Sequence, residues 1–382
     1  MKAGRKIQKT FNKLGPISRI TNGTLYAGGA AMVLSLCAGG MARADDGVTV
    51  YGLIDDSIAS THTGGTRTRP GNNQVSLLTG GWTDSLWGIK GEESLDGGWK
   101  ARFGLESGID SATGRSLDGQ DRLFDYGAWV GLDHAGYGAV KLGRLSTVAQ
   151  EYGGQLEVAS WRDMGMGQLL KDSDNFRRDR TLNLYTPDIG GAQLGVGRSF
   201  NDRSGVPDMQ AWSLGFKYAS GPWLGVLTWD RSSRALGDSH GGSPSAAQAG
   251  VTYITDDGYQ FSVAWSRQRN GFVEQDIGWS GGPAAFMYGG YADSWLVGAQ
   301  IPVSTSGSVL MQVSQDRPSW HEADGSRAHP VALATLGYRY TLSPRTSLYA
   351  FIGRQTRGSL ADPFDHDTGG VTRVAVGVTH SF

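Results

Sequence analysis

The amino-acid sequence predicts an all-β fold, a transmembrane 16-stranded antiparallel β-barrel, from three observations. Apolar and polar side chains alternate with a period of two along much of the chain. Short turns alternate with long polar connections. The chain contains 59 glycines and many aromatic residues, yet it has no apolar run long enough to cross a bilayer as a helix. A barrel whose strands present one face to lipid and the other to water accounts for all three observations.

The first element, residues 1–44, is predicted to be a signal peptide. It contains seven basic residues and no acidic one, followed by an apolar stretch from about Leu25 to Ala38. That stretch is shorter than the ~20 residues of a spanning helix, which argues against the alternative of a membrane anchor. Ala42-Arg43-Ala44 is the small-x-small pattern at which a signal peptidase cleaves. Residues 45–382 are then predicted to form one barrel domain.

Composition after the leader excludes several kinds of site and partner. The mature chain has 28 basic against 36 acidic residues, a net charge of −8, which argues against a nucleic-acid partner. Cys37 is the only cysteine and lies in the leader, so the mature chain has no disulfide and no thiolate metal site. A lipid anchor on Cys37 is an alternative, but Leu36 is larger than the residue that normally precedes such a cysteine.

The clearest strand pattern runs from Tyr259 to Ser266. Tyr259, Phe261, Val263 and Trp265 share one face, and Gln260, Ser262, Ala264 and Ser266 share the other. Residues 99–106, 212–218 and 373–382 alternate in the same way. The apolar faces carry aromatic residues near their ends and almost no charge, as expected where a charge at mid-bilayer costs ~2–4 kcal/mol. A soluble β-sandwich also alternates, but it explains neither the aromatic ends nor the loop lengths.

The connections predict the strand number. Seven short turns rich in Gly, Pro, Asp and Ser alternate with eight longer polar loops, which gives sixteen strands with both chain ends on one side. The short turns lie near residues 95–98, 133–136, 187–191, 219–222, 255–258, 303–307 and 342–345. The third long loop, Ser146–Phe176, is the longest stretch without a strand pattern, and a loop of that length is usually functional or disordered. Folded inward, it would narrow the lumen.

Several motifs occur in a fixed order along the chain. They are Val48-Thr-Val-Tyr51-Gly52-Leu-Ile-Asp55, Trp87-Gly-Ile-Lys90-Gly-Glu-Glu93, Gly97-Gly-Trp-Lys100-Ala101, Leu105-Glu-Ser-Gly108, Ala128-Trp-Val-Gly-Leu132, Lys141-Leu-Gly-Arg144 and Val376-Gly-Val-Thr-His-Ser-Phe382. In combination they resemble the Gram-negative general porins of the beta-proteobacterial type, over nearly the whole mature chain. The resemblance implies an outer-membrane barrel that lets small hydrophilic solutes diffuse.

The resemblance also implies partners. Porins of this type are usually homotrimers, surrounded by outer-membrane lipid and lipopolysaccharide. A C-terminal phenylalanine such as Phe382 is read by the outer-membrane assembly machinery.

The resemblance further implies a constriction in which an acidic third loop faces a basic wall. The candidate acidic side consists of Glu151, Glu157, Asp163, Asp172 and Asp174. The candidate basic side consists of Arg177, Arg178 and Arg180, with Lys90, Lys100 and Arg102 inward by parity. The family commonly has inward arginines at the positions of Leu86 and Tyr126, so this constriction is expected to be less positive or differently lined. Charges of both signs predict weak ion discrimination.

The sequence contains no G-x-S-x-G, Walker-type or H-E-x-x-H motif, so no enzyme, cofactor or metal is predicted. Two weaker patterns remain. His366 lies between Asp365 and Asp367 with Ser359 nearby, which leaves a barrel hydrolase as an alternative. Asp172-Ser-Asp-Asn175 begins like a calcium loop but lacks its glycine and distal glutamate. A surface protein whose long loops bind a host or phage is compatible with the barrel.

Overall fold

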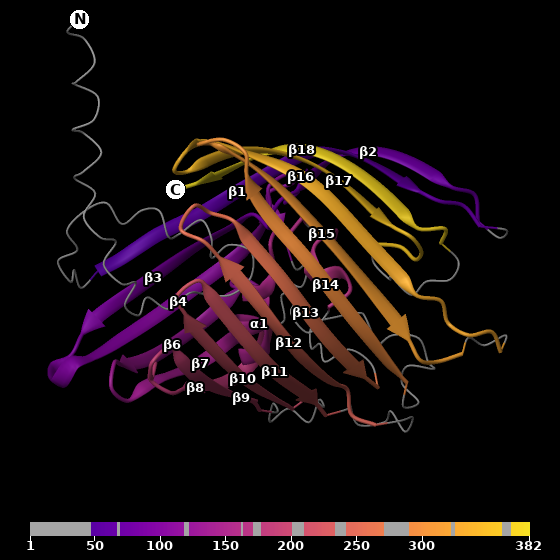
Figure 1. Ribbon diagram of the computed structural model, residues 1–382. Helices are drawn as coiled ribbons and strands as arrows, with labels where there is room; N and C mark the ends of the chain where they lie inside the picture. The colour runs from indigo at the N-terminus through magenta and orange to yellow at the C-terminus, as the bar shows by residue number, and fades with distance from the viewer. Residues whose placement is uncertain are drawn as a thin grey trace, which may run out of the picture.

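The computed structural model describes residues 47–66, 69–117, 122–161, 163–170, 177–200, 210–233, 242–270, 290–321, 325–360 and 368–382. The chain forms a closed antiparallel sheet, in which β1 (Gly47–Thr63) pairs with β18 (Val371–Ser381) along most of its length (Figure 1). Among the described residues, no helix is both long enough and apolar enough to cross a membrane.

The predicted sixteen strands are confirmed. Two short pieces explain why eighteen segments are labelled: β2 and β3 are the two halves of the second barrel strand, since both pair with β1, and β5 is a two-residue hairpin partner of β4. The remaining bounds are β2 Asn72–Thr79, β3 Leu86–Ser94, β4 Trp99–Asp110, β5 Arg115–Ser116, β6 Gly127–His134, β7 Gly138–Ser146, β8 Arg177–Tyr185, β9 Ala192–Ser199, β10 Ala211–Ser220, β11 Trp223–Ser232, β12 Ser245–Ile254, β13 Gln260–Arg269, β14 Tyr291–Pro302, β15 Gly307–Pro318, β16 Val331–Ser343 and β17 Thr346–Gln355.

The alternation in sequence becomes an alternation between the outside and the inside of the barrel. On β13, Phe261 and Val263 are exposed on the outer surface, whereas Ser262 and Ala264 are buried within. Because the exposed residues in this part of the strand are apolar, this part of the outer face suits hydrocarbon rather than water.

All seven short turns lie between consecutive strands where the sequence predicts them. They gather at one end of the barrel with the start of β1 and the C-terminus, and the long connections leave the other end (Figure 1). At the seam Phe382 exchanges two backbone hydrogen bonds with Gly52, N···O distances 3.0 and 3.2 Å.

The break in the second strand was not predicted. Residues 80–85 turn inward between β2 and β3, and the Asp55 carboxylate on β1 accepts hydrogen bonds from the backbone N–H groups of Gly81 (2.9 Å) and Thr83 (3.2 Å). The Tyr349 hydroxyl donates to the same carboxylate at 2.6 Å. The inward turn carries Trp82 into the barrel, where its ring lies 5.7 Å from that of Tyr349.

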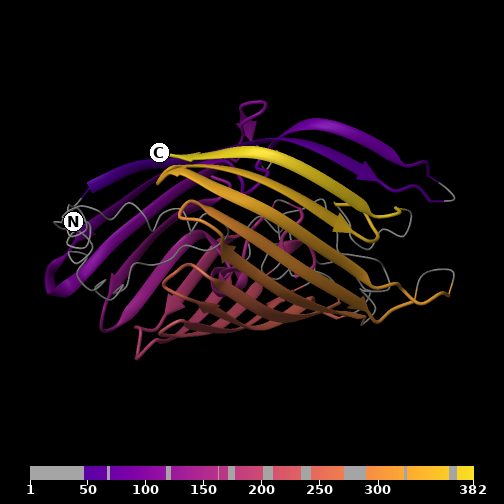
Figure 2. The ribbon, with the colours of Figure 1, turned by 45° about the horizontal axis from the view of Figure 1, so that its top comes forward.

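A second irregular feature lies on the outer surface. The β4–β5 hairpin projects from the barrel wall (Figure 2, the violet hairpin above the yellow strand). Just before it, Ser111 donates a hydrogen bond to the outward-facing Asp56 of β1 at 2.5 Å and contacts Thr79 of β2 at 2.6 Å. Asp56 and Thr79 therefore form a polar spot on the outer face of β1 and β2, beside the exposed side chains of Ile58 and Leu77.

Candidate functional site

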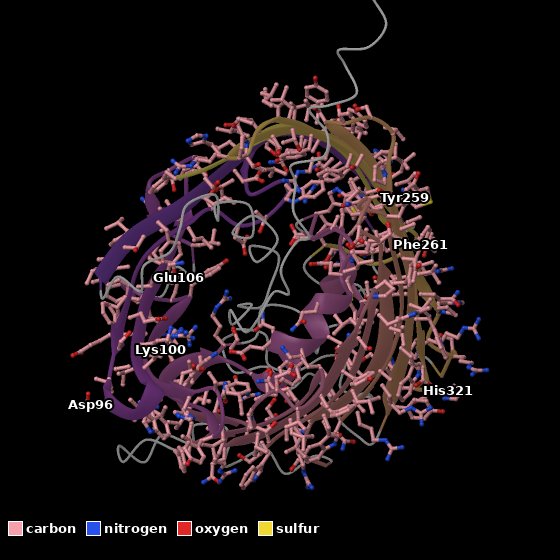
Figure 3. The ribbon with its side chains drawn as sticks, turned by 60° about the vertical axis from the view of Figure 1, so that its left-hand side comes forward. Asp96, Lys100, Glu106, Tyr259, Phe261 and His321 are labelled. Carbon is pink, nitrogen blue, oxygen red and sulfur yellow. The ribbon has the colours of Figure 1, made fainter. Side chains whose placement is uncertain are left out.

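The connection between β7 and β8 lies inside the ring of strands. It contains α1 (Val148–Gly153) and two 3-10 turns, Gly154–Leu156 and Met166–Gln168. Figure 3, a view along the barrel, shows α1 within the ring. We call its described residues, 147–161 and 163–170, the inner loop.

Local chemistry sets the start of α1. The Thr147 hydroxyl accepts a hydrogen bond from the Gln150 N–H at 3.1 Å, an N-cap that satisfies one of the free donors of the first turn. The wall supplies another partner, because the Ser213 hydroxyl accepts from the Ala149 N–H at 2.9 Å.

One turn later, Glu151 is buried against the wall. Its carboxylate accepts from the Lys141 ammonium on β7 at 3.2 Å and from the Tyr185 hydroxyl on β8. The next residue, Tyr152, donates its hydroxyl to Gln193 at 3.0 Å. Burial, with the Glu151 charge, raises the pKa of Tyr152, so this phenol stays protonated. These contacts fix the root of the inner loop to the wall.

Inward-facing glycines make room for the apolar side chains of the inner loop. A Cβ atom added at any of six glycines would lie less than 3.0 Å from one of these side chains. The pairs are Gly195 with Val148, Gly215 with Val148 and Tyr152, Gly250 with Leu156, Gly298 with Val158, Gly337 with Trp161, and Gly353 with Met164. We call these six residues the glycine seats. They form a track around the inner wall from β9 to β17, and the inner loop follows it.

The loop turns back at Trp161, whose φ of 31° is rarely adopted by a bulky side chain. Its indole is fully buried and meets the ring of Trp82 edge-on at 6.0 Å and that of Phe351 at 6.2 Å. The Met164 N–H donates to the Trp161 carbonyl at 2.6 Å and closes the turn. Strain of this kind, of order 1–3 kcal/mol, persists where surrounding contacts hold it.

The returning segment is also held by wall side chains. The Thr335 hydroxyl donates to the Met164 carbonyl at 2.7 Å, and the Gln268 amide donates to the Leu169 carbonyl at 3.2 Å. The Gln168 amide donates to the Gln355 side chain at 3.0 Å. Contacts to β13, β16 and β17 therefore anchor this end of the inner loop.

The three described candidate acids have different surroundings. Glu151 is paired beneath the loop. Glu157 accepts hydrogen bonds from the Met166 N–H and the Ser160 hydroxyl, both at 3.1 Å, and so stabilises the turn. Asp163, with a side chain 42% exposed, forms an ion pair with Arg373 of β18 at 3.3 Å. Asp163 is the one of these three that meets a wall cation while exposed. Asp172 and Asp174 lie outside the described residues.

The candidate cations separate into two groups. Lys90, Lys100 and Arg102 lie on β3 and β4, towards the short-turn end. Glu92 holds two of them, with N···O distances of 2.5 Å to Lys100 and 2.8 Å to Arg102, and Lys90 lies 4.9 Å from the ring of Tyr51. Lys100 and Glu106 lie on the inner side of this wall, whereas Tyr259 and Phe261 project outward from the opposite one (Figure 3).

The second group begins β8, close to where the inner loop starts. The Arg177 guanidinium lies 3.7 Å from the ring centroid of Tyr126, and the Tyr126 hydroxyl donates to Asp84. Arg178 is buried, and Arg180 is exposed at a bulge with a φ of 50°. At one position where the family commonly has an arginine, the structure thus places a tyrosine covered by a guanidinium from another strand. Leu86, at the second such position, is buried, and the residues on either side of it in the chain, Ser85 and Trp87, are uncharged.

Sequence reasoning missed three residues at the tip of the inner loop, two that contact it and one that contacts Trp82 beside it. Arg373 pairs with Asp163, Arg339 lies 5.3 Å from the ring of Trp82, and Trp82 packs on Trp161. The parity of β16 and β18 places both arginines inward, so that signal was present in the sequence. The inward turn that carries Trp82 left no comparable signal.

No group of three or more His, Cys, Asp or Glu suited to a metal ion occurs among the residues that the structure describes. His366 with its flanking aspartates lies outside them. What the arrangement offers is a water-accessible wall with charges of both signs, facing a loop with one exposed carboxylate. Opposed fixed charges across a narrow aqueous path produce a transverse field and discriminate solutes by charge.

Comparisons with known proteins agree with this geometry. A family model described as Gram-negative porin matches residues 30–359. An outer membrane porin protein of Bordetella pertussis is 27% identical over 396 residues, covering 92% of this chain and 99% of that protein. Outer membrane porin protein 32 of Delftia acidovorans is 28% identical over 389 residues, covering 91% and 97%.

Two solved structures share the fold. The anion-selective porin from Comamonas acidovorans has a TM-score of 0.65 at 23% identity, covering 88% of this chain and 99% of that one. OmpF of Salmonella typhi, in complex with daunomycin, has a TM-score of 0.66 at 14% identity, covering 88% and 97%.

Proposed function

Because this chain belongs to the family of Gram-negative porins, we propose that its barrel is an outer-membrane channel for passive diffusion of small hydrophilic solutes and ions. The chain is a pore and not an enzyme. One observation carries this conclusion: sixteen strands close into a ring that is apolar outside and charged on the part of the inner wall that the loop leaves uncovered.

The test is the conductance of the purified protein. Full-length folded chain added to a planar lipid bilayer should produce stepwise, long-lived current increases in KCl. The same protein unfolded by heat serves as the control. Folded protein that inserts without any conductance would contradict the channel function.

The inner loop is the proposed constriction. Its apolar side is buried in the glycine seats, and Asp163 on its other side is exposed beside Arg373. Ions therefore pass between this loop and the wall that carries Arg177 and the Lys90 to Arg102 group. Because both signs are present, we expect weak selectivity, in contrast to the anion-selective relative. A reversal potential near zero in a KCl gradient supports this expectation, and a strong preference for either ion contradicts it.

A homotrimer is the proposed assembly. Asp56 is half-buried on the outward face of β1, where contact between a charge and lipid is unfavourable, by ~2–4 kcal/mol for a basic side chain at mid-bilayer and by less for a carboxylate. A protein neighbour would remove that cost, and the β4–β5 hairpin projects from the same surface. Native mass spectrometry of the detergent-solubilised protein should give three copies. A monomer at all concentrations would contradict it.

Export and assembly follow from the two chain ends. We expect cleavage after Ala44, so the mature protein purified from outer membranes should begin at Asp45. Phe382 is the proposed signal for the assembly machinery, and its deletion should reduce the amount of folded barrel in the outer membrane. A normal yield of folded protein without Phe382 would exclude that role.

A further inference from the structure

An apolar groove of about 460 Å³ lies on the outer surface of the barrel, across β10 to β14. Its floor contains Gly225 and Ala249, and Tyr218, Trp265 and Trp295 lie around it. The outward face of a porin barrel touches lipid, so the occupant of such a groove is a hydrocarbon chain.

A strip of small side chains connects this groove to the long-loop end of the barrel. From the groove towards the long-loop end, the outward residues of β12 are Ala249, Ala247 and Ser245. On the neighbouring strands the residues at the same heights are large. Leu227 and Trp265 flank Ala249, and Trp229 and Arg267 flank Ala247. The strip is therefore recessed between two rows of bulky side chains.

Two arginines lie at the long-loop end of the strip. Ser245 pairs with Arg231 of β11 on one side and with Arg269 of β13 on the other, and both arginines are exposed. Since adjacent strands are ~4.8 Å apart, the two arginine backbones lie about 10 Å apart. That separation allows both guanidinium groups to reach one anion between them.

A third arginine is already neutralised. Arg267 forms a bidentate ion pair with Asp293, both N···O distances 2.7 Å, and lies 4.5 Å from the ring of Tyr291. The Asp293 charge is thereby compensated, so among the residues that the structure describes Arg231 and Arg269 give this end of the strip a net positive charge.

The distance between the groove and the two arginines matches the thickness of one membrane leaflet. Six residues separate Gly225 from Arg231, which at ~3.3 Å per residue is about 20 Å along the strand. Half of the hydrocarbon core is ~15 Å thick, so a groove near the middle of the membrane places the arginines at the headgroups. Trp229 lies two residues below Arg231 on β11, at the height where interfacial aromatic residues are expected.

We propose that this surface binds the lipid A part of lipopolysaccharide, with a phosphate between Arg231 and Arg269 and one acyl chain along β12 in the groove. The proposal rests on the outer-membrane location given under the proposed function. Barrels of that membrane have short periplasmic turns and long extracellular loops, which places the long-loop end in the outer leaflet. Charge and shape select this occupant: guanidinium groups match phosphate oxygens, and the recessed strip accepts a hydrocarbon chain attached to the same headgroup.

The experiment measures binding of purified lipid A to the folded full-length protein in detergent, by native mass spectrometry. Arg231→Gln and Arg269→Gln should each weaken binding roughly tenfold, the loss expected for one charge-assisted partner. Gly225→Leu tests the groove separately. A Cβ there would meet only the Tyr218 carbonyl oxygen, at 4.0 Å, so the larger side chain fills the groove without disturbing the strand. It should weaken binding by a similar factor.

Arg317→Gln is the matched control, because Arg317 is an exposed outward residue of β15 outside this groove. It should leave lipid A binding unchanged, and lipid A stripped of its phosphates should bind the unsubstituted protein as weakly as the arginine variants bind lipid A. Equal losses from Arg317→Gln and Arg231→Gln would overturn the proposal in favour of a diffuse charge effect. No loss from Gly225→Leu would overturn the acyl-chain part.

Conductance separates this proposal from the proposed function. All four variants lie outside the lumen and should retain the single-channel current of the unsubstituted protein. Loss of lipid A binding with normal current supports the site. Absent current in every protein would instead count against the channel and leave the binding comparison to stand by itself.

Discussion

The inner wall of the barrel has a half covered by the inner loop and a half left bare. On the covered half, from β9 to β17, inward residues under the loop include the six glycine seats and uncharged hydrogen-bonding side chains such as Ser213 and Thr335. On the bare half, β3 and β4 carry Lys90, Lys100 and Arg102, with Glu92 between two of them. Both halves show the same period-two alternation in sequence.

The comparison shows that an inward position can serve two different purposes. On the covered half the residue is small because another side chain occupies the space above it, and any larger group would collide with the loop. On the bare half the residue is charged because water reaches it. Part of the unusual glycine content of this chain is therefore explained by the packing of one loop.

Removing the anchor of the loop should produce the largest effect. Trp161→Ala deletes a fully buried indole, a change that costs ~3–5 kcal/mol in a packed core. We expect the loop tip to leave the covered wall, with a noisier and altered single-channel current and a lower thermal midpoint. Trp265→Ala, which removes an outward indole, is the control for current. Identical current traces from Trp161→Ala and the unsubstituted protein would show that the loop does not set the pore.

Filling a seat should act in the same direction but more weakly. In Gly337→Leu the new Cβ lies 2.9 Å from the Trp161 ring and 3.1 Å from the Ala350 carbonyl oxygen. Overpacking of this kind costs ~1–3 kcal/mol. The matched control is Gly225→Leu, whose outward position is open. The thermal midpoint measured by circular dichroism should fall for Gly337→Leu alone. Equal midpoints for the two leucine variants would contradict the role of the seats.

These two glycines also show what the sequence could predict. Period-two parity identifies Gly337 as inward and Gly225 as outward, and parity with turn chemistry was sufficient for the strand number and every short turn. Parity does not reveal that a distant loop covers Gly337. The contact joins residues 176 positions apart, and no local pattern encodes it.

The candidate site was predictable to a similar extent. The start of β8 at Arg177 and the position of the loop followed from the sequence and the family resemblance. The partners did not, because Glu151 meets Lys141 and Asp163 meets Arg373 only after the loop has folded back on the wall. The position of Trp82 was not predicted, because an inward turn held by the Asp55 carboxylate interrupts the second barrel strand at this residue.

The bare half of the inner wall should control the ion preference of the channel, and substitution of Arg177 tests this expectation. Its guanidinium lies on the ring of Tyr126, a contact worth ~0.5–2 kcal/mol, so the charge is held at a fixed place. Arg177→Gln should raise the cation-to-anion permeability ratio by about twofold, measured as a reversal potential in a KCl gradient. Arg317→Gln removes an equal charge from the outer surface and should not shift it. A shift of the same size in both variants would mean that the effect does not arise in the lumen.

The smallest effect is expected where the two halves meet. Asp163→Asn removes the exposed carboxylate of the inner loop but preserves its backbone, because asparagine tolerates the φ of 60° at this position. The ion pair with Arg373 is partly exposed, and such pairs contribute ~0–1 kcal/mol, so the thermal midpoint should change little.

The released Arg373 charge should shift the reversal potential towards anions by less than Arg177→Gln shifts it towards cations. Screening lengths fall from ~10 Å at 0.1 M salt to ~3 Å at 1 M, so the shift should be visible in dilute KCl and nearly absent in 1 M KCl. A shift of unchanged size at 1 M would place Asp163 so close to the ion path that salt no longer screens it. In that case the loop tip and the bare wall together, rather than the bare wall alone, determine which ions pass.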